Sequence, residues 1–195
     1  MRIALALKGL EYEIVNVNLL ENAHNMDDYK ALNPQGRVPL LIDNNIALNQ
    51  SLAIIEYLED LYTNPSLFPD DLIMRQKSRA FAHAIAADIF PLQNLSTRKK
   101  IGADFNQSTE DQAKWSAFWI EKGFSTLEKE LENNPPNCEY LFADFPTIAD
   151  ICLVPQWNNA IRYGVEILKF PILAQFDKKA RNHPAFISTA PETQK

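Results

Sequence analysis

The chain has little glycine, little cysteine and no long apolar run, and each shortage excludes a class of protein. Its 195 residues include five glycines against twelve prolines, and Cys138 and Cys152 are its two cysteines. Two cysteines are too few for a disulfide scaffold, so a reduced, cytoplasmic location is expected. No window holds eighteen uncharged apolar residues, which excludes a membrane-spanning helix. We expect no metal ion.

The chain also lacks an excess of positive charge. It holds 19 Lys and Arg against 25 Asp and Glu, a formal net charge of −6. This balance argues against a nucleic-acid partner bound through its phosphates. Residues 1–70 carry four basic and ten acidic residues (4 − 10 = −6), whereas residues 71–195 carry fifteen of each. The uneven distribution predicts two units with different surfaces.

What is present is enough apolar sequence for a packed core: 46% of the residues are hydrophobic and 10% aromatic, too many for a disordered chain. The first 64 residues are typical of a mixed unit. The patterns predict a helix over 4–8 that ends at Gly9, a strand over 13–17, a short helix over 27–32, a hairpin of strands 38–42 and 46–48, and a helix that Ser51 caps.

The segment Asn64–Pro69 is typical of a linker, and the sequence after it predicts long helices. These are a helix over 71–100 that Pro91 kinks, a helix from Ser108 whose core face is Trp115, Trp119, Leu127 and Leu131, a helix over 151–162, and a last helix from Pro171 to Arg181. The fold class is therefore predicted to be α+β, with a first domain over 1–64 and an all-helical domain over 71–195.

Two short patterns in the first domain each leave two interpretations open. Pro39 interrupts a strand-like run, which indicates either an edge strand or bulge, or a cis proline that leaves the neighbouring backbone available to an extended ligand. Gln50-Ser51 indicates either a plain helix N-cap or an anion site, because the first amides of a helix attract carboxylates.

Several motifs together resemble the zeta class of glutathione transferases, which includes the maleylacetoacetate isomerases. The resemblance extends from Arg2 to Gln194. The motifs are Ile3–Gly9, Leu32–Gly36, Val38-Pro39, Gln50–Leu58, Pro91–Leu95, Ala149-Asp150, Leu153–Gln156, Asn159-Ala160 and Pro184–Phe186. It implies a thioredoxin-like N-terminal domain without its first strand, followed by the all-α C-terminal domain of a glutathione transferase.

The resemblance also implies residues that bind the cofactor glutathione. Val38, before the structural Pro39, would pair through its backbone with the cysteinyl part, and Gln50 and Ser51 would hold the γ-glutamyl end. His24 would reach the glycyl end, although a lone loop histidine is otherwise interpreted as solvated. Asn94 and Ser96 match positions near the bound tripeptide.

Three residues of the helical domain match further family positions. Thr147 and Asp150 match a buried capping box, which implies a role in folding rather than in catalysis. Arg162 matches an arginine that binds a carboxylate of a small diketo-acid substrate, and its plain interpretation is a solvated arginine at a helix end. Cys138 and Cys152 are interpreted as structural.

The sequence departs from the family pattern at two places. Phe90 occupies a position where zeta enzymes usually have a polar Gln or His, so one glutathione contact is expected to be lost or supplied elsewhere. The family's leading strand and its thiol-activating Ser-Ser or Ser-Cys pair align upstream of Met1. We therefore expect that no thiol-activating residue lies in this sequence, that Met1 is a valine codon used as a start, and that the native protein extends upstream.

Three functions remain open at this point. The resemblance implies a glutathione-dependent cis-trans isomerisation of maleylacetoacetate to fumarylacetoacetate in tyrosine and phenylalanine catabolism, by a homodimer. One alternative is a zeta-type transferase or dehalogenase of small α-halo acids. The other is a transferase-like binding protein without catalysis.

Overall fold

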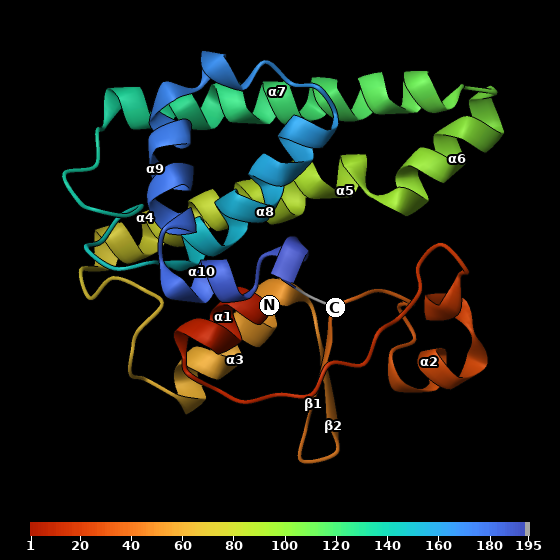
Figure 1. Ribbon diagram of the computed structural model, residues 1–195, viewed down its shortest axis with the longest axis horizontal. Helices are drawn as coiled ribbons and strands as arrows, with labels where there is room; N and C mark the ends of the chain where they lie inside the picture. Colours follow the sequence, from red (N-terminus) through yellow and green to blue (C-terminus); the bar gives the residue numbers. More distant parts are fainter. Residues whose placement is uncertain (194–195) are drawn as a thin grey trace. The chain divides into compact units, whose positions relative to one another are not determined.

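A computed structural model describes residues 1–193 and divides the chain into two compact units, one over Met1–Ser66 and one that begins at Leu67 (Figure 1). The predicted α+β class is confirmed, because a two-stranded sheet occurs in the first unit and the second unit is helical. The elements of the first unit are α1 (Arg2–Leu7), the 3₁₀ turn Ala23–Asn25, α2 (Asp27–Leu32), β1 (Leu40–Asp43), β2 (Ile46–Asn49) and α3 (Ser51–Leu61).

The hairpin of the first unit forms as its turn residues predict. Strands β1 and β2 pair antiparallel, with Leu40 opposite Asn49 and Asp43 opposite Ile46. The two turn residues, Asn44 and Asn45, have φ values of 47° and 64°. Asparagine tolerates this left-handed region better than most residues, and two-residue hairpin turns require it.

The strand predicted over residues 13–17 is wrong: these residues form no strand. Their β-branched composition favours an extended backbone, but a strand exists only when its amides and carbonyls pair with a neighbour. Within residues 1–193 the one sheet consists of β1 and β2, so the segment has no ladder to join.

A buried ion pair ties the first helix to the end of the third. The Lys8 side chain has no solvent exposure, and its Nζ lies 2.5 Å from Glu59 Oε2. The same ammonium donates to the carbonyls of Tyr62 at 2.5 Å and Pro65 at 2.6 Å. The other Glu59 oxygen accepts from the Ser66 hydroxyl at 2.5 Å. A buried charge needs such partners, because an unpaired one is strongly destabilising.

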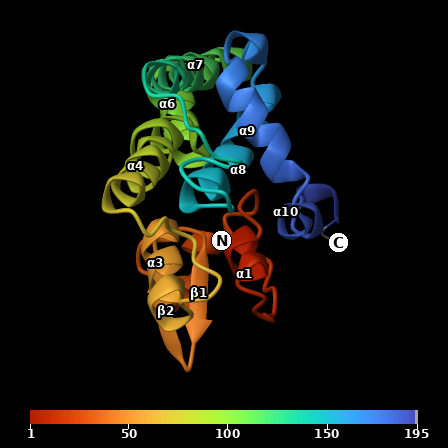
Figure 2. The same ribbon diagram turned by 90° about the vertical axis from the view of Figure 1, so that its left-hand side faces the viewer.

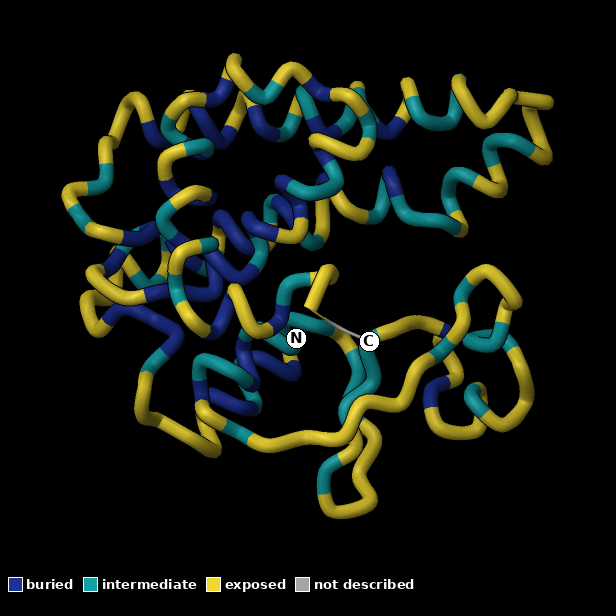
Figure 3. Tube along the Cα trace, in the orientation of Figure 1, coloured by how far each residue is buried: buried dark blue, intermediate teal, exposed yellow. Residues whose placement is uncertain are grey.

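The second unit is a helical bundle. Its elements are α4 (Leu72–His83), a π-helical turn (Ala84–Ile89), α5 (Phe90–Gln93), α6 (Leu95–Phe105), α7 (Thr109–Asn133), α8 (Ile148–Arg162), the 3₁₀ turn Ile167–Lys169, α9 (Pro171–Arg181), α10 (Pro184–Ser188) and the 3₁₀ turn Pro191–Thr193. Figure 2 shows α8 between α4 and α9. Burial is dense along α8 (Figure 3), where nine residues are buried, so α8 is the central element of this core.

For the second unit, one helix prediction is wrong and another is confirmed only in part. Residues 71–100 do not form one helix kinked at Pro91, because a π-helical turn precedes that proline and Asn94 ends the segment. Asn94 has an extended ψ of 164° and caps the separate helix α6. On α7 the predicted core residues Leu127 and Leu131 are buried, together with Ile120 and Phe124, whereas Trp115 is 36% exposed. Its indole donates to the Leu92 carbonyl at 2.7 Å instead, which satisfies a polar group that a dry core would leave unpaired.

Thr147 and Asp150 form the capping box of α8. The Asp150 carboxylate accepts from Thr147 N at 2.8 Å and from Leu141 N at 3.1 Å, and Thr147 Oγ1 accepts from Ala149 N at 3.2 Å. Both residues are fully buried. The box therefore fixes the start of the central helix and the preceding loop together.

Asp150 is expected to make stability depend on pH. Burial raises its pKa from 3.8 to about 7, against the opposing effect of the donors Thr147 N and Leu141 N. The native carboxyl then holds its proton more tightly than the unfolded one. Its favourable contribution is complete below pH 3.8 and is lost as pH rises towards about 7. Urea unfolding of the wild type and Asp150→Asn across this range should show the wild type losing stability relative to the variant. A constant difference would contradict the assignment.

A glutamate of α7 caps α9 from a distance. Glu128, which is 4% exposed, accepts from Ile172 N at 2.7 Å and from Leu173 N at 2.9 Å. The N-cap residue of α9, Phe170, forms no side-chain cap of its own. Glu128→Gln keeps the shape but removes the charge and one acceptor, so the free energy of unfolding should fall by about 1–3 kcal/mol. Glu132→Gln, on the exposed side of α7, is the control. Equal unfolding midpoints for the two variants in urea would contradict this role.

Candidate functional site

The start of α3 has an unusual backbone and an unused helix N-terminus. Gln50 precedes the helix with φ 67° and ψ 110°, a left-handed φ that is costly for a non-glycine residue. Ser51 is the first helical residue, so the prediction that its hydroxyl caps α3 is wrong. No side-chain cap bonds to the first amides of α3 among the described residues. These N–H groups and the positive end of the helix dipole remain available to an anion.

A second polar segment, residues 33–38, lies beside Gln50. The Gln50 Nε2 donates to Gln35 Oε1 at 2.8 Å, which connects the two segments directly. The Val38–Pro39 bond is cis, and Val38 is exposed. None of the hydrogen bonds among residues 1–193 uses the backbone of Val38, so its N–H and C=O groups are available to a ligand.

The loop that carries His24 contacts the same segment. Gly36 has φ 58°, and a Cβ built there would lie 3.0 Å from the His24 carbonyl and 2.8 Å from Asn25 Oδ1. A side chain at this position would therefore push the two loops apart. His24 Nδ1 is enclosed and has no hydrogen-bond partner in the described part of the chain. The first unit thus brings together the loops that carry His24, Val38 and Gln50.

Asn94 and Ser96, both in the second unit, have a local structural function. Asn94 Oδ1 accepts from Thr97 N at 2.9 Å and from the Ser96 hydroxyl at 2.7 Å. Their polar atoms therefore complete the N-cap of α6. Phe90, which begins α5, is 48% exposed, and its phenyl side chain has no hydrogen-bonding group.

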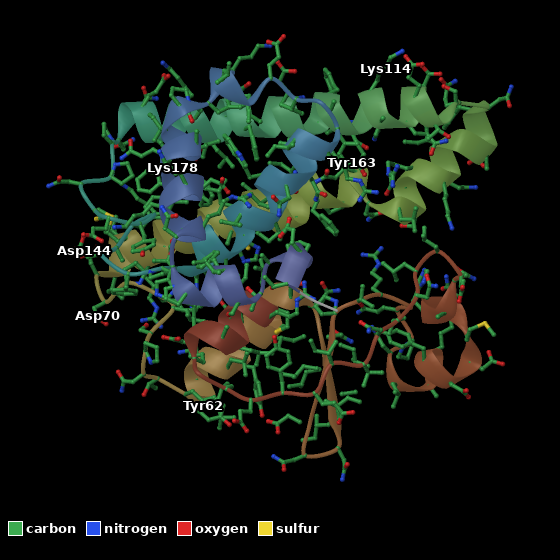
Figure 4. The ribbon with its side chains drawn as sticks, in the orientation of Figure 1. Tyr62, Asp70, Lys114, Asp144, Tyr163 and Lys178 are labelled. Atoms are coloured by element: carbon green, nitrogen blue, oxygen red, sulfur yellow. The ribbon has the colours of Figure 1, made fainter. Side chains whose placement is uncertain are left out.

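Arg162 has a partner that sequence reasoning missed. Its guanidinium lies 5.8 Å from the ring of Tyr163, and the guanidinium of Arg98 on α6 lies 5.4 Å from the same ring. Tyr163, labelled in Figure 4, follows the last residue of α8. Among residues 1–193 neither guanidinium forms an ion pair with a carboxylate, and Arg98 Nε is enclosed without a partner. Arg98 is half-buried and Arg162 is exposed, and both guanidiniums lie at the ring of Tyr163.

The two cysteines have no features of a reactive pair. Burial raises the pKa of Cys152 to about 12, and burial and Asp144 raise the pKa of Cys138. Both are free thiols, and a raised pKa keeps them protonated and weakly nucleophilic at neutral pH. Within residues 1–193 no group of His, Cys, Asp and Glu could hold a metal ion, and no helix is both long and apolar enough to span a bilayer.

Comparison with known proteins agrees with this fold. Residues 1–60 match the family described as "Glutathione S-transferase, N-terminal domain", and residues 93–184 match "Glutathione S-transferase, C-terminal domain". The two matches cover more than half of the chain and correspond to the two units. The chain therefore belongs to the glutathione S-transferase family.

The relatives specify the class within the family. The chain is 39% identical, over its whole length and 90% of the relative's, to a probable maleylacetoacetate isomerase of Vibrio cholerae. A holo structure of maleyl pyruvate isomerase, described as a bacterial zeta-class glutathione transferase, superimposes with a TM-score of 0.96 at 39% identity, covering 99% of this chain and 91% of that one. A Methylobacterium maleylacetoacetate isomerase, solved with bound malonate and glutathione, gives 0.95 at 30% identity, covering 100% and 91%. The predicted zeta-class resemblance is confirmed.

Proposed function

We propose that the protein is a glutathione-dependent isomerase that converts maleylacetoacetate to fumarylacetoacetate. The observation that carries the proposal is the pair of unpaired guanidiniums, Arg98 and Arg162, at the ring of Tyr163. The substrate is an acid with a carboxylate at each end, and planar guanidinium groups bind carboxylates by paired hydrogen bonds. That a structural relative was solved with the dicarboxylate malonate together with glutathione supports this ligand chemistry.

The residues of the first unit fit the cofactor glutathione. The α-carboxylate of its γ-glutamyl end suits the uncapped amides and the Ser51 hydroxyl at the start of α3, and Gln50 adds an amide. The unpaired Val38 backbone suits the extended cysteinyl part. His24 has an unpartnered ring nitrogen for the glycyl end. When bound, glutathione supplies a thiol that can add reversibly to a conjugated double bond.

The residues of the second unit would orient the diketo acid. Arg98 and Arg162 would hold a carboxylate through charge-assisted hydrogen bonds, and the Tyr163 ring would keep both guanidiniums in place. Holding one end of the substrate fixes one side of its conjugated carbon–carbon bond, and a cis-trans isomerase must allow the other side to rotate about that bond. Asn94 and Ser96 would border the cofactor, while their side chains also cap α6.

The experiment is an isomerisation assay with competing substrates. Purified protein should convert the cis diketo acid to the trans product with glutathione present, with product geometry read by proton NMR. A small α-halo acid, supplied at the same concentration, should release halide more slowly. Rapid halide release without isomerisation would establish the dehalogenase instead, and glutathione binding without either reaction would establish a binding protein.

The protein is further proposed to act as a homodimer in the cytoplasm. The support is the family membership, the reduced cysteines and the acidic first third of the chain against a neutral remainder. Sedimentation equilibrium should give a mass twice the 22.2 kDa of one chain. A mass of one chain at micromolar concentration would contradict the dimer.

A further inference from the structure

Asn33 is buried in a segment whose neighbours are exposed. It has no solvent exposure, whereas the apolar Leu32 before it is 50% exposed, and Pro34 and Gln35 after it are exposed. This reverses the usual preference of apolar side chains for the interior. The side-chain amide of a fully buried asparagine needs hydrogen-bond partners, because an unsatisfied amide in the interior is costly.

The Asn33 side-chain amide forms a hydrogen bond with the peptide group that joins Arg37 to Val38. Its Nδ2 donates to the Arg37 carbonyl at 2.7 Å, and the Tyr29 hydroxyl donates to the same oxygen at 2.7 Å. The Arg37 carbonyl oxygen is therefore held by two donors of the protein itself. The Arg37–Val38 bond is trans, so its C=O and N–H groups point in opposite directions. Fixing the Arg37 oxygen inward fixes the Val38 N–H outward.

The other side of the same amide connects two segments. Asn33 Oδ1 accepts from Gln35 N at 3.2 Å and lies 3.5 Å from Nδ2 of Asn49, the last residue of β2. Asn49 directly precedes Gln50 and the start of α3. One buried side chain thus holds both the Val38 peptide and the approach to the Gln50-Ser51 turn, and Gln35 reinforces the connection through Gln50.

We propose that Asn33, assisted by Tyr29, is a positioning residue for glutathione. It touches no ligand itself. It aims the Val38 N–H and sets its separation from the Gln50-Ser51 turn, so that one tripeptide can use both. This inference rests on the proposed glutathione-dependent function, and it adds a requirement for Asn33 that the comparisons do not specify.

The test measures glutathione affinity by calorimetry and then steady-state kinetics. Asn33→Asp keeps the size and the Oδ1 acceptor but sets an oxygen against the Arg37 carbonyl, and Tyr29→Phe removes the second donor without a charge change. We expect a glutathione Kd about tenfold higher for Asn33→Asp and about threefold higher for Tyr29→Phe. The KM for glutathione should rise in parallel, while the KM for the diketo acid and kcat at saturating glutathione stay within about twofold.

A matched control separates positioning from added charge and from lost stability. Asn18→Asp places the same charge in the same unit, at an exposed turn where Oδ1 accepts from Leu20 N and that acceptor is retained. It should leave the glutathione Kd unchanged. If all three variants bind glutathione as the wild type does, or if kcat falls with the melting temperature while the Kd and KM for glutathione keep their wild-type values, the positioning role is overturned. A wild type that fails to bind glutathione instead overturns the proposed function, and this inference with it.

Discussion

Removing both arginines at Tyr163 is expected to lower kcat/KM for the diketo acid by at least roughly hundredfold. Each guanidinium contributes charge-assisted hydrogen bonds to a carboxylate, and such bonds are worth about 1.5–3 kcal/mol. Two of them correspond to about two to four powers of ten in rate. The Arg98→Ala/Arg162→Ala double variant should keep its glutathione affinity, because neither arginine is among the residues proposed to contact the cofactor, which are His24, Val38, Gln50, Ser51, Asn94 and Ser96.

Two further variants make this prediction specific. Arg162→Lys keeps the charge but loses the planar fork, so it should fall between the wild type and Arg162→Ala. Arg75→Ala removes another arginine of the same unit, whose guanidinium lies 5.3 Å from the ring of Phe68, and should leave kcat/KM unchanged. If the double variant turns over the diketo acid as fast as Arg75→Ala does, the two arginines do not bind the substrate.

Replacing Lys8 by methionine is expected to cost about 3–5 kcal/mol of stability, because it leaves the Glu59 carboxylate buried without its cation. The pair is almost entirely shielded from solvent, with side-chain exposures of 0% and 8%. Urea unfolding followed by far-UV circular dichroism measures the loss. The loss of stability should affect the first unit most, because Lys8 also binds the carbonyls of Tyr62 and Pro65. Glutathione binding should weaken with it.

The stability lost in Lys8→Met should come from the unpaired Glu59 carboxylate rather than from the lost contact alone. A second change, Glu59→Gln, removes that charge, so the double variant should recover part of the stability that Lys8→Met loses. Lys114→Met is the surface control, because its partner Glu110 is 78% exposed and solvent screens the pair. A Lys8→Met protein that unfolds at the same urea concentration as Lys114→Met would contradict the buried-pair interpretation.

Sequence reasoning succeeds here where the determining chemistry is local. The Asn44-Asn45 turn, the Ser108 cap and the Thr147–Asp150 capping box each depend on residues within four positions of one another. The backbone there has few alternatives, so the residue types fix the conformation. The zeta-class motifs then extended these local signals to the fold of both units.

Sequence reasoning failed where a residue far away in the chain determines the local structure. The segment 13–17 has strand-forming residues but no neighbouring strand to pair with. Glu128 caps a helix that begins 43 positions later in the chain, counting from 128 to Pro171 (171 − 128 = 43). Arg98 follows Ser96 in a basic run that is typical of a solvated helix face, and its position beside Tyr163 arises only from packing. Asn94 offered one usable signal, because an Asn directly before an apolar residue is a helix-start pattern.

The rate of isomerisation as a function of glutathione concentration, with free thiol titrated before and after the reaction, tests the central claim most directly. The claim is that the first unit holds glutathione as a cofactor while the second holds the diketo acid. It predicts a rate that is negligible without glutathione, rises to saturation with it, and leaves the total thiol unchanged after many turnovers. A rate independent of glutathione, or the loss of one thiol for each substrate molecule converted, would contradict it.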